Sequence, residues 1–291
     1  MRNREPITVL AVGGTGESYC GDERTQVTGM LAAVTDALDE RFVARWVPYP
    51  ASYGPAPEPG GVCYLESVSA GVTNLSHAIA AADGPVMVIG YSQGAVVIRA
   101  LLSHPAAAQL LPKVAAVGFI ADPHQPPGVV RGCDGWGVAG AGPDLPGEIP
   151  AYWVGDPHDM ICNASADSLL RDVADLTPTL SGRQTRLWLT DVYARVASRR
   201  MQNAAKTRIG PSQWRRDVRR LANARREVLG YLPRAVQIGG FGLQNGSGGR
   251  HVSYGTEPYR MAPLTDPDTT GCEDLAHWMQ VQATLGVSAV A

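Results

Sequence analysis

The pentapeptide Gly90-Tyr91-Ser92-Gln93-Gly94 lies between an apolar run, Val86 to Ile89, and the helix-like residues 95–102. A G-x-S-x-G sequence between a strand and a helix predicts a sharp turn that lifts the serine hydroxyl to the carboxyl edge of a parallel sheet. Glycines on both sides of the serine allow the backbones to approach closely there. We therefore expect an α/β fold in which Ser92 is a nucleophile. The alternative is a glycine-rich turn that only packs a helix on a strand.

Strand-like and helix-like segments alternate along the rest of the chain. Apolar residues at helical spacing predict helices over residues 27–38 and 65–79, and continuous apolar runs predict strands at residues 7–12, 42–49, 114–121 and 149–154. Continuous apolar strands joined by helices indicate a mainly parallel sheet that is covered on both faces. We expect a three-layer α/β sandwich with its site at the carboxyl ends of the strands.

Composition excludes several classes of protein. The chain has 291 residues, a net charge of −2 and 45% hydrophobic residues, which is typical of a globular domain and not of a disordered or generally nucleic-acid-binding chain. No run approaches the roughly eighteen apolar residues of a membrane span. Residues 1–6 lead directly into the first strand and leave no room for a signal peptide. We expect synthesis in a cytoplasm, or a leader that has been removed.

The five cysteines, at positions 20, 63, 133, 162 and 272, have no C-x-x-C spacing. This argues against structural zinc and against a thioredoxin-like site. Buried free thiols and one or two disulfides both stay open, although the odd count leaves at least one thiol free. No metal or cofactor is expected.

Residues 165–235 differ in composition from the rest of the chain. They contain 15 Lys and Arg against 6 Asp and Glu, so they carry +9 and the remaining chain carries −11. Helical stripes with Trp188 and Trp214 predict amphipathic helices inserted as a lid or linker into one domain of residues 1–291. We expect the arginines to face solvent or an anionic envelope, among them Arg215, Arg216, Arg219 and Arg220. After this insertion, residues 239–249 are predicted to form a flexible loop.

A serine nucleophile needs a base, a carboxylate that orients the base, and donors for the oxyanion. Hydrolases with this turn place these residues in the order serine, acid, histidine. Asp156 and Asp159 follow the strand-like residues 149–154, and Asp122 follows residues 114–121, so all three are candidate acids. His251 follows them on a glycine-rich stretch and is the expected base. The other five histidines fit less well, and His277 is expected to face solvent; the remaining four are His77, His104, His124 and His158.

Three ordered motifs carry a resemblance to a known family. Residues 90–95, 159–162 and 251–255 resemble the nucleophile, acid and histidine motifs of the cutinase superfamily. Within it, Gly13-Gly14-Thr15-Gly16, the long helical insertion and the absence of a signal peptide are similar to the lysin B enzymes of mycobacteriophages, which are mycolylarabinogalactan esterases. Residues 49–54 and 66–72 also resemble that family.

The resemblance implies a cutinase-like α/β-hydrolase that cleaves the ester between mycolic acids and arabinogalactan during phage lysis. It assigns Ser92 as nucleophile, Asp159 rather than Asp156 as acid, and His251 as base, with the oxyanion held by the backbone N–H groups of Thr15 and Gln93. It implies synthesis in the infected host's cytoplasm, action on the envelope, and no nucleic-acid partner. Secreted cutinases pair the cysteine after the acid with one just before it, and this chain has no cysteine there.

Two other functions stay open. One is a cutinase, lipase or acyltransferase that acts on other envelope or storage lipids. The other is an inactive module that binds the envelope through its basic insertion. Loss of ester hydrolysis in Ser92→Ala would exclude the inactive module.

Overall fold

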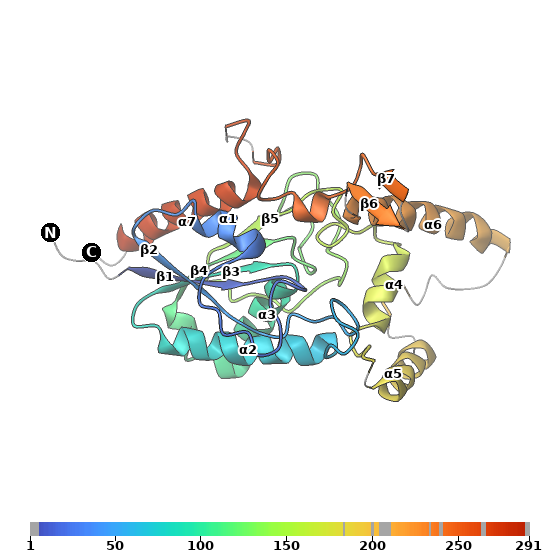
Figure 1. Ribbon diagram of the computed structural model, residues 1–291, viewed down its shortest axis with the longest axis horizontal. Coiled ribbons are helices and arrows are strands. Elements are labelled where there is room, and N and C mark those ends of the chain that lie inside the picture. The colour runs from blue at the N-terminus through green and yellow to red at the C-terminus, as the bar shows by residue number, and fades with distance from the viewer. Residues whose placement is uncertain are drawn as a thin grey trace.

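Five parallel strands form the central sheet of the computed structural model, which describes residues 6–182, 184–198, 201–203, 211–232, 234–238, 241–262 and 266–288. The strands follow the order β2-β1-β3-β4-β5 (Figure 1). They are β1 (Ile7–Val12), β2 (Phe42–Trp46), β3 (Val86–Tyr91), β4 (Val114–Ile120) and β5 (Ala151–Val154). The predicted parallel sheet is confirmed.

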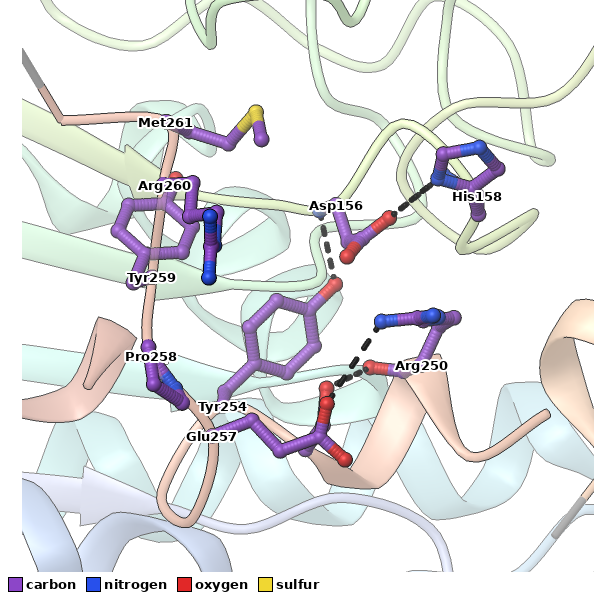
Figure 2. A pocket seen from close by; sticks show the side chains of 10 residues that line it. Asp156, His158, Arg250, Tyr254, Glu257, Pro258, Tyr259, Arg260 and Met261 are labelled. Atoms are coloured by element: carbon purple, nitrogen blue, oxygen red, sulfur yellow. Dashed lines mark hydrogen bonds and ion pairs between the residues drawn. The ribbon is translucent and has the colours of Figure 1, made fainter. Parts of the chain in front are cut away.

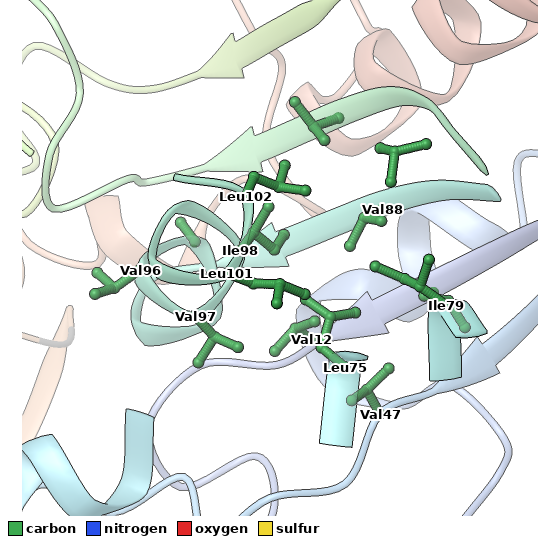
Figure 3. Close-up of a cluster of buried hydrophobic side chains, with 14 of the residues drawn as sticks. Val12, Val47, Leu75, Ile79, Val88, Val96, Val97, Ile98, Leu101 and Leu102 are labelled. Carbon is green, nitrogen blue, oxygen red and sulfur yellow. The ribbon is translucent and has the colours of Figure 1, made fainter. Parts of the chain in front are cut away.

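Helices cover both faces of this sheet (Figure 1). One face packs against α2 (Tyr64–Ala81) and α3 (Gln93–Leu102), and the other against α1 (Ala32–Thr35) and α7 (Gly271–Ser288). Alternate strand residues enter the two cores, because successive side chains of a strand point to opposite faces. In β1, Leu10 and Val12 join the α2–α3 core shown in Figure 3, whereas Val9 and Ala11 join the other core.

Two predicted elements are shorter than expected. The helix predicted over residues 27–38 consists of a 3-10 turn, η1 (Gly29–Leu31), followed by the single turn α1. The strand predicted to extend to Tyr49 ends at Trp46. The Val47 N–H still donates to the Ala11 carbonyl oxygen of β1 at 2.9 Å, but the Tyr49 N–H donates to the Ser18 hydroxyl instead of to β1. The chain therefore leaves the sheet there, although Val47 and Tyr49 are buried. Two further 3-10 turns, η2 (Pro105–Ala107) and η3 (Leu111–Lys113), precede β4.

Three helices lie between β5 and the last part of the chain: α4 (Leu169–Leu176), α5 (Thr185–Ala197) and α6 (Pro211–Tyr231). They lie at the end of the molecule opposite the two termini (Figure 1). The helices predicted around Trp188 and Trp214 are therefore present. One expectation for them is wrong, because Arg220 is buried and ion-paired with Asp172 rather than exposed. The side chain of Arg216 lies outside the described side chains.

The flexible loop predicted for residues 239–249 is wrong in part. Strand β6 (Ala235–Ile238) pairs antiparallel with β7 (Phe241–Gln244), so four residues of the predicted loop belong to a hairpin. The sequence contains the cue, because two short runs with β-forming residues are separated by Gly239-Gly240, a dipeptide typical of hairpin turns. The 3-10 turn η5 (Arg250–Val252) follows. No helix among the described residues is long and apolar enough to cross a bilayer.

Candidate active site

Ser92 occupies a strained turn between β3 and α3. Its backbone has φ 52° and ψ −115°, a conformation that non-glycine residues rarely adopt and that clusters at functional sites. Both flanking glycines are required by close contacts. A Cβ on Gly94 would lie 2.0 Å from the Val12 carbonyl oxygen, and one on Gly90 would lie 2.6 Å from Ile98 Cδ1. The half-buried Ser92 is thus held at the carboxyl end of the central strand.

His251 and Asp159 are brought together from opposite ends of the helical insertion. His251 Nδ1 lies 2.8 Å from Asp159 Oδ2, and both side chains are buried. The Ile161 backbone N–H donates to the other carboxylate oxygen of Asp159 at 3.0 Å. A carboxylate against Nδ1 places a proton on that nitrogen and leaves Nε2 as the acceptor. Among the described residues, no hydrogen bond joins the Ser92 hydroxyl to His251.

The other two candidate acids are engaged elsewhere. Asp156 accepts hydrogen bonds from the backbone and ring of His158, whose side chain is exposed. Asp122 is fully buried and forms an ion pair with Arg99 at 2.6 Å, and it also accepts from the Trp153 indole. Asp122 is therefore part of a buried polar cluster beneath α3.

None of the other five histidines contacts Asp159 in the described part of the chain. His124 lies 3.0 Å through Nδ1 from the Gly140 carbonyl oxygen, and burial lowers its pKa below the ordinary value. His277 is exposed on α7, as predicted, and His77, His104 and His158 are also exposed.

Three tyrosines surround the histidine and its acid. Tyr91 donates to the His251 carbonyl oxygen at 2.8 Å, and its ring stacks on the imidazole with the centroids 5.0 Å apart. The Tyr231 ring, at the end of α6, lies 5.1 Å from the imidazole. Tyr254 donates to Asp159 Oδ2 at 2.8 Å. Burial raises the pKa of both Tyr91 and Tyr254, so both remain protonated donors.

Sequence reasoning missed these roles. Tyr91 and Tyr254 both lie inside the motifs that carry the resemblance, but the partners of Tyr91 and Tyr254 are 160 and 95 residues away in the chain. Tyr231 belongs to the insertion, and nothing in its sequence surroundings indicates a contact with His251. For Tyr91 the available signal was its position directly before Ser92.

The segment after β1 lies beside the serine turn. A Cβ on Gly14 would come within 3.3 Å of Ser92 Cβ. The Thr15 hydroxyl donates to Gln93 Oε1 at 3.1 Å, and the Gln93 amide donates to the Ser52 carbonyl oxygen at 3.0 Å. The two residues predicted to hold an oxyanion are therefore linked through their side chains.

Glu17 fixes this segment and was not singled out from the sequence. Its carboxylate accepts from the backbone N–H groups of Gly14 and Met30, each at 2.7 Å. It thereby ties the segment that contains Thr15 to the turn before α1. Glycine at position 29 is required there, since a Cβ would lie 2.3 Å from the Glu17 carboxylate and the residue has φ +66°.

All five cysteines are unpaired. Cys162 is buried beside Cys133, and burial raises the pKa of the Cys162 thiol well above its ordinary value. Cys20 is exposed and the other four cysteines are buried. Within the described residues no group of three or more His, Cys, Asp or Glu side chains could hold a metal ion.

A cavity of about 360 Å³ lies on the outer side of the acid loop (Figure 2). Asp156 and His158 line one side, and the segment from Arg250 to Met261 lines the other. Tyr254 separates this cavity from the acid, because its hydroxyl bonds both Asp159 and the Asp156 backbone N–H. The position of Asp156 on this cavity explains why it does not reach His251.

The serine turn after the central strand of a parallel, two-sided sheet decides the fold. The chain has an α/β-hydrolase fold. Residues 42–142 match the model of the PE-PPE domain; this segment includes Ser92 and ends before Asp159. No curated protein matches the chain.

Solved structures with similarity to this chain are α/β-hydrolases of low sequence identity. A cutinase-like protein from Cryptococcus sp. is 15% identical, with 54% of this chain and 79% of that chain covered and a TM-score of 0.42. An acetylxylan esterase is 20% identical, with 64% and 97% covered and a TM-score of 0.39. The cutinase of Trichoderma reesei is 20% identical, with 65% and 75% covered and a TM-score of 0.33.

Proposed function

We propose that this protein is a serine esterase with Ser92 as nucleophile, His251 as base and Asp159 as acid. The observation that carries the proposal is the 2.8 Å contact between His251 Nδ1 and Asp159, next to a serine in a strained turn. A half-buried serine at a strand end, a histidine with its Nε2 available as acceptor and a buried carboxylate are the parts of acyl transfer.

The reaction follows from these positions. His251 Nε2 takes the proton as the Ser92 oxygen attacks the ester carbonyl carbon, and the negative charge develops on the carbonyl oxygen. The backbone N–H groups of Gln93 and Thr15 stabilise that oxyanion. His251 returns the proton to the leaving alcohol. Water then attacks the acyl-enzyme with His251 again as base, which releases the acid and restores Ser92.

For the substrate we propose the ester that links mycolic acids to arabinogalactan, cleaved when a phage lyses its host. The support is the resemblance of residues 13–16 and of the long insertion between Asp159 and His251 to the lysin B enzymes, in a chain whose three motifs resemble the cutinase superfamily. The enzyme would be made in the infected cell and act on the envelope. The competing substrates are other envelope or storage lipid esters, with a second alcohol in place of water in the case of an acyltransferase.

Two assays test the esterase activity and the proposed substrate separately. Hydrolysis of p-nitrophenyl butyrate that disappears in Ser92→Ala and His251→Ala, and persists in His277→Ala, supports the esterase and its base. Incubation with isolated mycolylarabinogalactan then tests the substrate by the release of free mycolic acids. Butyrate hydrolysis without mycolic acid release would reject the substrate and keep the esterase. No hydrolysis of either ester would reject the esterase.

A further inference from the structure

The apolar side of helix α6 is exposed rather than turned toward the core. Trp214, Val218 and Leu221 follow one another at spacings of four and three residues, so they lie on one side of the helix. All three are exposed, Trp214 to 73% and Leu221 to 59%, and Leu229 continues the stripe about two turns later. A surface helix ordinarily turns such a stripe toward the core.

The side of α6 that faces the protein is polar instead. Arg220, only 2% exposed, pairs with Asp172 at 2.6 Å and donates to the Asp167 carbonyl oxygen at 2.7 Å. Glu227, about two turns after Arg220, is also buried. Its carboxylate accepts hydrogen bonds from the Ser165 backbone N–H and the Ser168 hydroxyl. These hydrogen bonds determine the rotation of the helix and thus expose its apolar stripe.

Positive charge accompanies the stripe. The exposed arginines of α6 are Arg215, Arg219, Arg225 and Arg226. The helix has two acids, the half-buried Asp217 and the buried Glu227, so its four exposed arginines outnumber them. An apolar stripe flanked by arginines is typical of helices that lie in the interface of a lipid layer with anionic headgroups.

The helix leads from this surface to the candidate site. Its last residue, Tyr231, contacts the His251 ring, and Val252, the residue after His251 in the 3-10 turn η5, is exposed. At 21 residues α6 is about 30 Å long, so a lipid layer along it would also lie near the site.

We propose that the outer face of α6 is a docking surface for an anionic lipid layer, with Trp214, Val218 and Leu221 inserted among the acyl chains and the arginines paired with headgroups. Docking is a binding event that goes beyond the proposed ester hydrolysis and does not require it. Its test can therefore use a protein that cannot cleave lipid.

The test measures flotation of the full chain, carrying Ser92→Ala, with vesicles of phosphatidylglycerol and phosphatidylcholine. Leu221→Ser should weaken binding by at least about tenfold, because a leucine side chain inserted among acyl chains leaves water and a serine side chain gains nothing from doing so. Leu285→Ser is the matched control, because Leu285 is also 59% exposed but lies on α7, and it should bind as the parent does. Arg215→Gln with Arg219→Gln should weaken binding most at low salt, whereas Arg45→Gln, an exposed arginine of β2, should not.

Three results would overturn the proposal. They are no binding of the parent to anionic vesicles, equal losses in Leu221→Ser and Leu285→Ser, and binding that depends on the arginines but not on Leu221, which would indicate a soluble polyanion. Each α6 variant is also made with Ser92 intact and assayed on p-nitrophenyl butyrate. Unchanged hydrolysis of that soluble ester shows that the variant folds, and it separates failure of docking from failure of the esterase.

Discussion

The Tyr254 hydroxyl donates to the same oxygen of Asp159, Oδ2, that lies 2.8 Å from His251 Nδ1. The Asp159 carboxylate is therefore in contact with both the imidazole and the phenol through one oxygen. Tyr254 also accepts from the Asp156 backbone N–H, so one phenol joins the acid to the loop that carries it.

Tyr254→Phe should lower kcat/KM on a soluble ester by about tenfold, since a hydrogen bond to a charged group contributes roughly 1.5–3 kcal/mol. Tyr152→Phe is the control, because Tyr152 donates to a different carboxylate, Asp274, at 2.7 Å. A kcat/KM equal to the parent's would show that Tyr254 has no positioning role.

The candidate acids should separate by substitution. Ser92→Ala and His251→Ala should each reduce hydrolysis by at least about a thousandfold, because members of a triad act as a unit. Asp159→Asn should cost less than these but far more than Asp156→Asn, whose carboxylate contacts His158 instead. Steady-state kinetics on one soluble ester measure all four. Equal losses at positions 156 and 159 would contradict the assignment of the acid.

Gly94→Ala should destabilise the fold by more than about 2 kcal/mol, because overpacking of this size displaces backbone. The added Cβ would lie 2.0 Å from the Val12 carbonyl oxygen, which cannot move without distorting β1. Gly147→Ala provides the comparison, since nothing lies within 4 Å of a Cβ at that position. Denaturant unfolding measures both. A Gly94→Ala protein as stable as the Gly147→Ala protein would refute the close approach.

Arg220→Gln should reduce the free energy of unfolding by about 3 kcal/mol, since it leaves a partly buried Asp172 without its partner. Arg219→Gln, on an exposed neighbour, should change it by less than about 0.5 kcal/mol. The thermal unfolding midpoints of the two variants, compared with that of the parent, measure both effects. Similar midpoints for the two variants would mean that α6 does not depend on its inner ion pair.

His124 should make the protein sensitive to acid. Burial lowers its pKa from the ordinary 6.5, so the unfolded chain binds more protons between that lowered value and pH 6.5. Stability then rises with pH through this window, is fully present above 6.5, and is lost as pH falls through it. In His124→Gln, which cannot titrate there, the loss on acidification should be smaller by up to about 1.4 kcal/mol per unit of pKa shift. Parallel stability–pH curves for the two proteins would exclude His124 as the cause.

The sheet could be predicted from sequence because its strands are continuous apolar runs, and the serine turn because its glycines mark it. The end of β2 was less predictable, because the Tyr49 N–H donates to the hydroxyl of Ser18, which lies 31 residues away in the chain. The pairing of β6 with β7 was not predicted, because a glycine-rich sequence is typical both of flexible loops and of hairpins.

The choice between Asp156 and Asp159 could not come from spacing, because the deciding contact joins residues 92 positions apart. The prediction for the orientation of α6 was wrong, and the error has a physical cause. Helical periodicity identifies an apolar and a polar face but does not show which of them faces the protein. The prediction that Arg220 is exposed assumed that the apolar face packs against the core. Arg220 and Glu227 reverse that choice through hydrogen bonds to α4 and the segment just before it.

Because the apolar side of α6 is exposed, the side chains that hold the helix in place differ from those that form its apolar surface. Where a helix is held by its apolar face, a change of that face alters both stability and surface. In α6 the residues that hold the helix, Arg220 and Glu227, are distinct from those that it displays, Trp214, Val218 and Leu221. The displayed residues can therefore change one at a time without compensating changes in the residues that hold the helix in place.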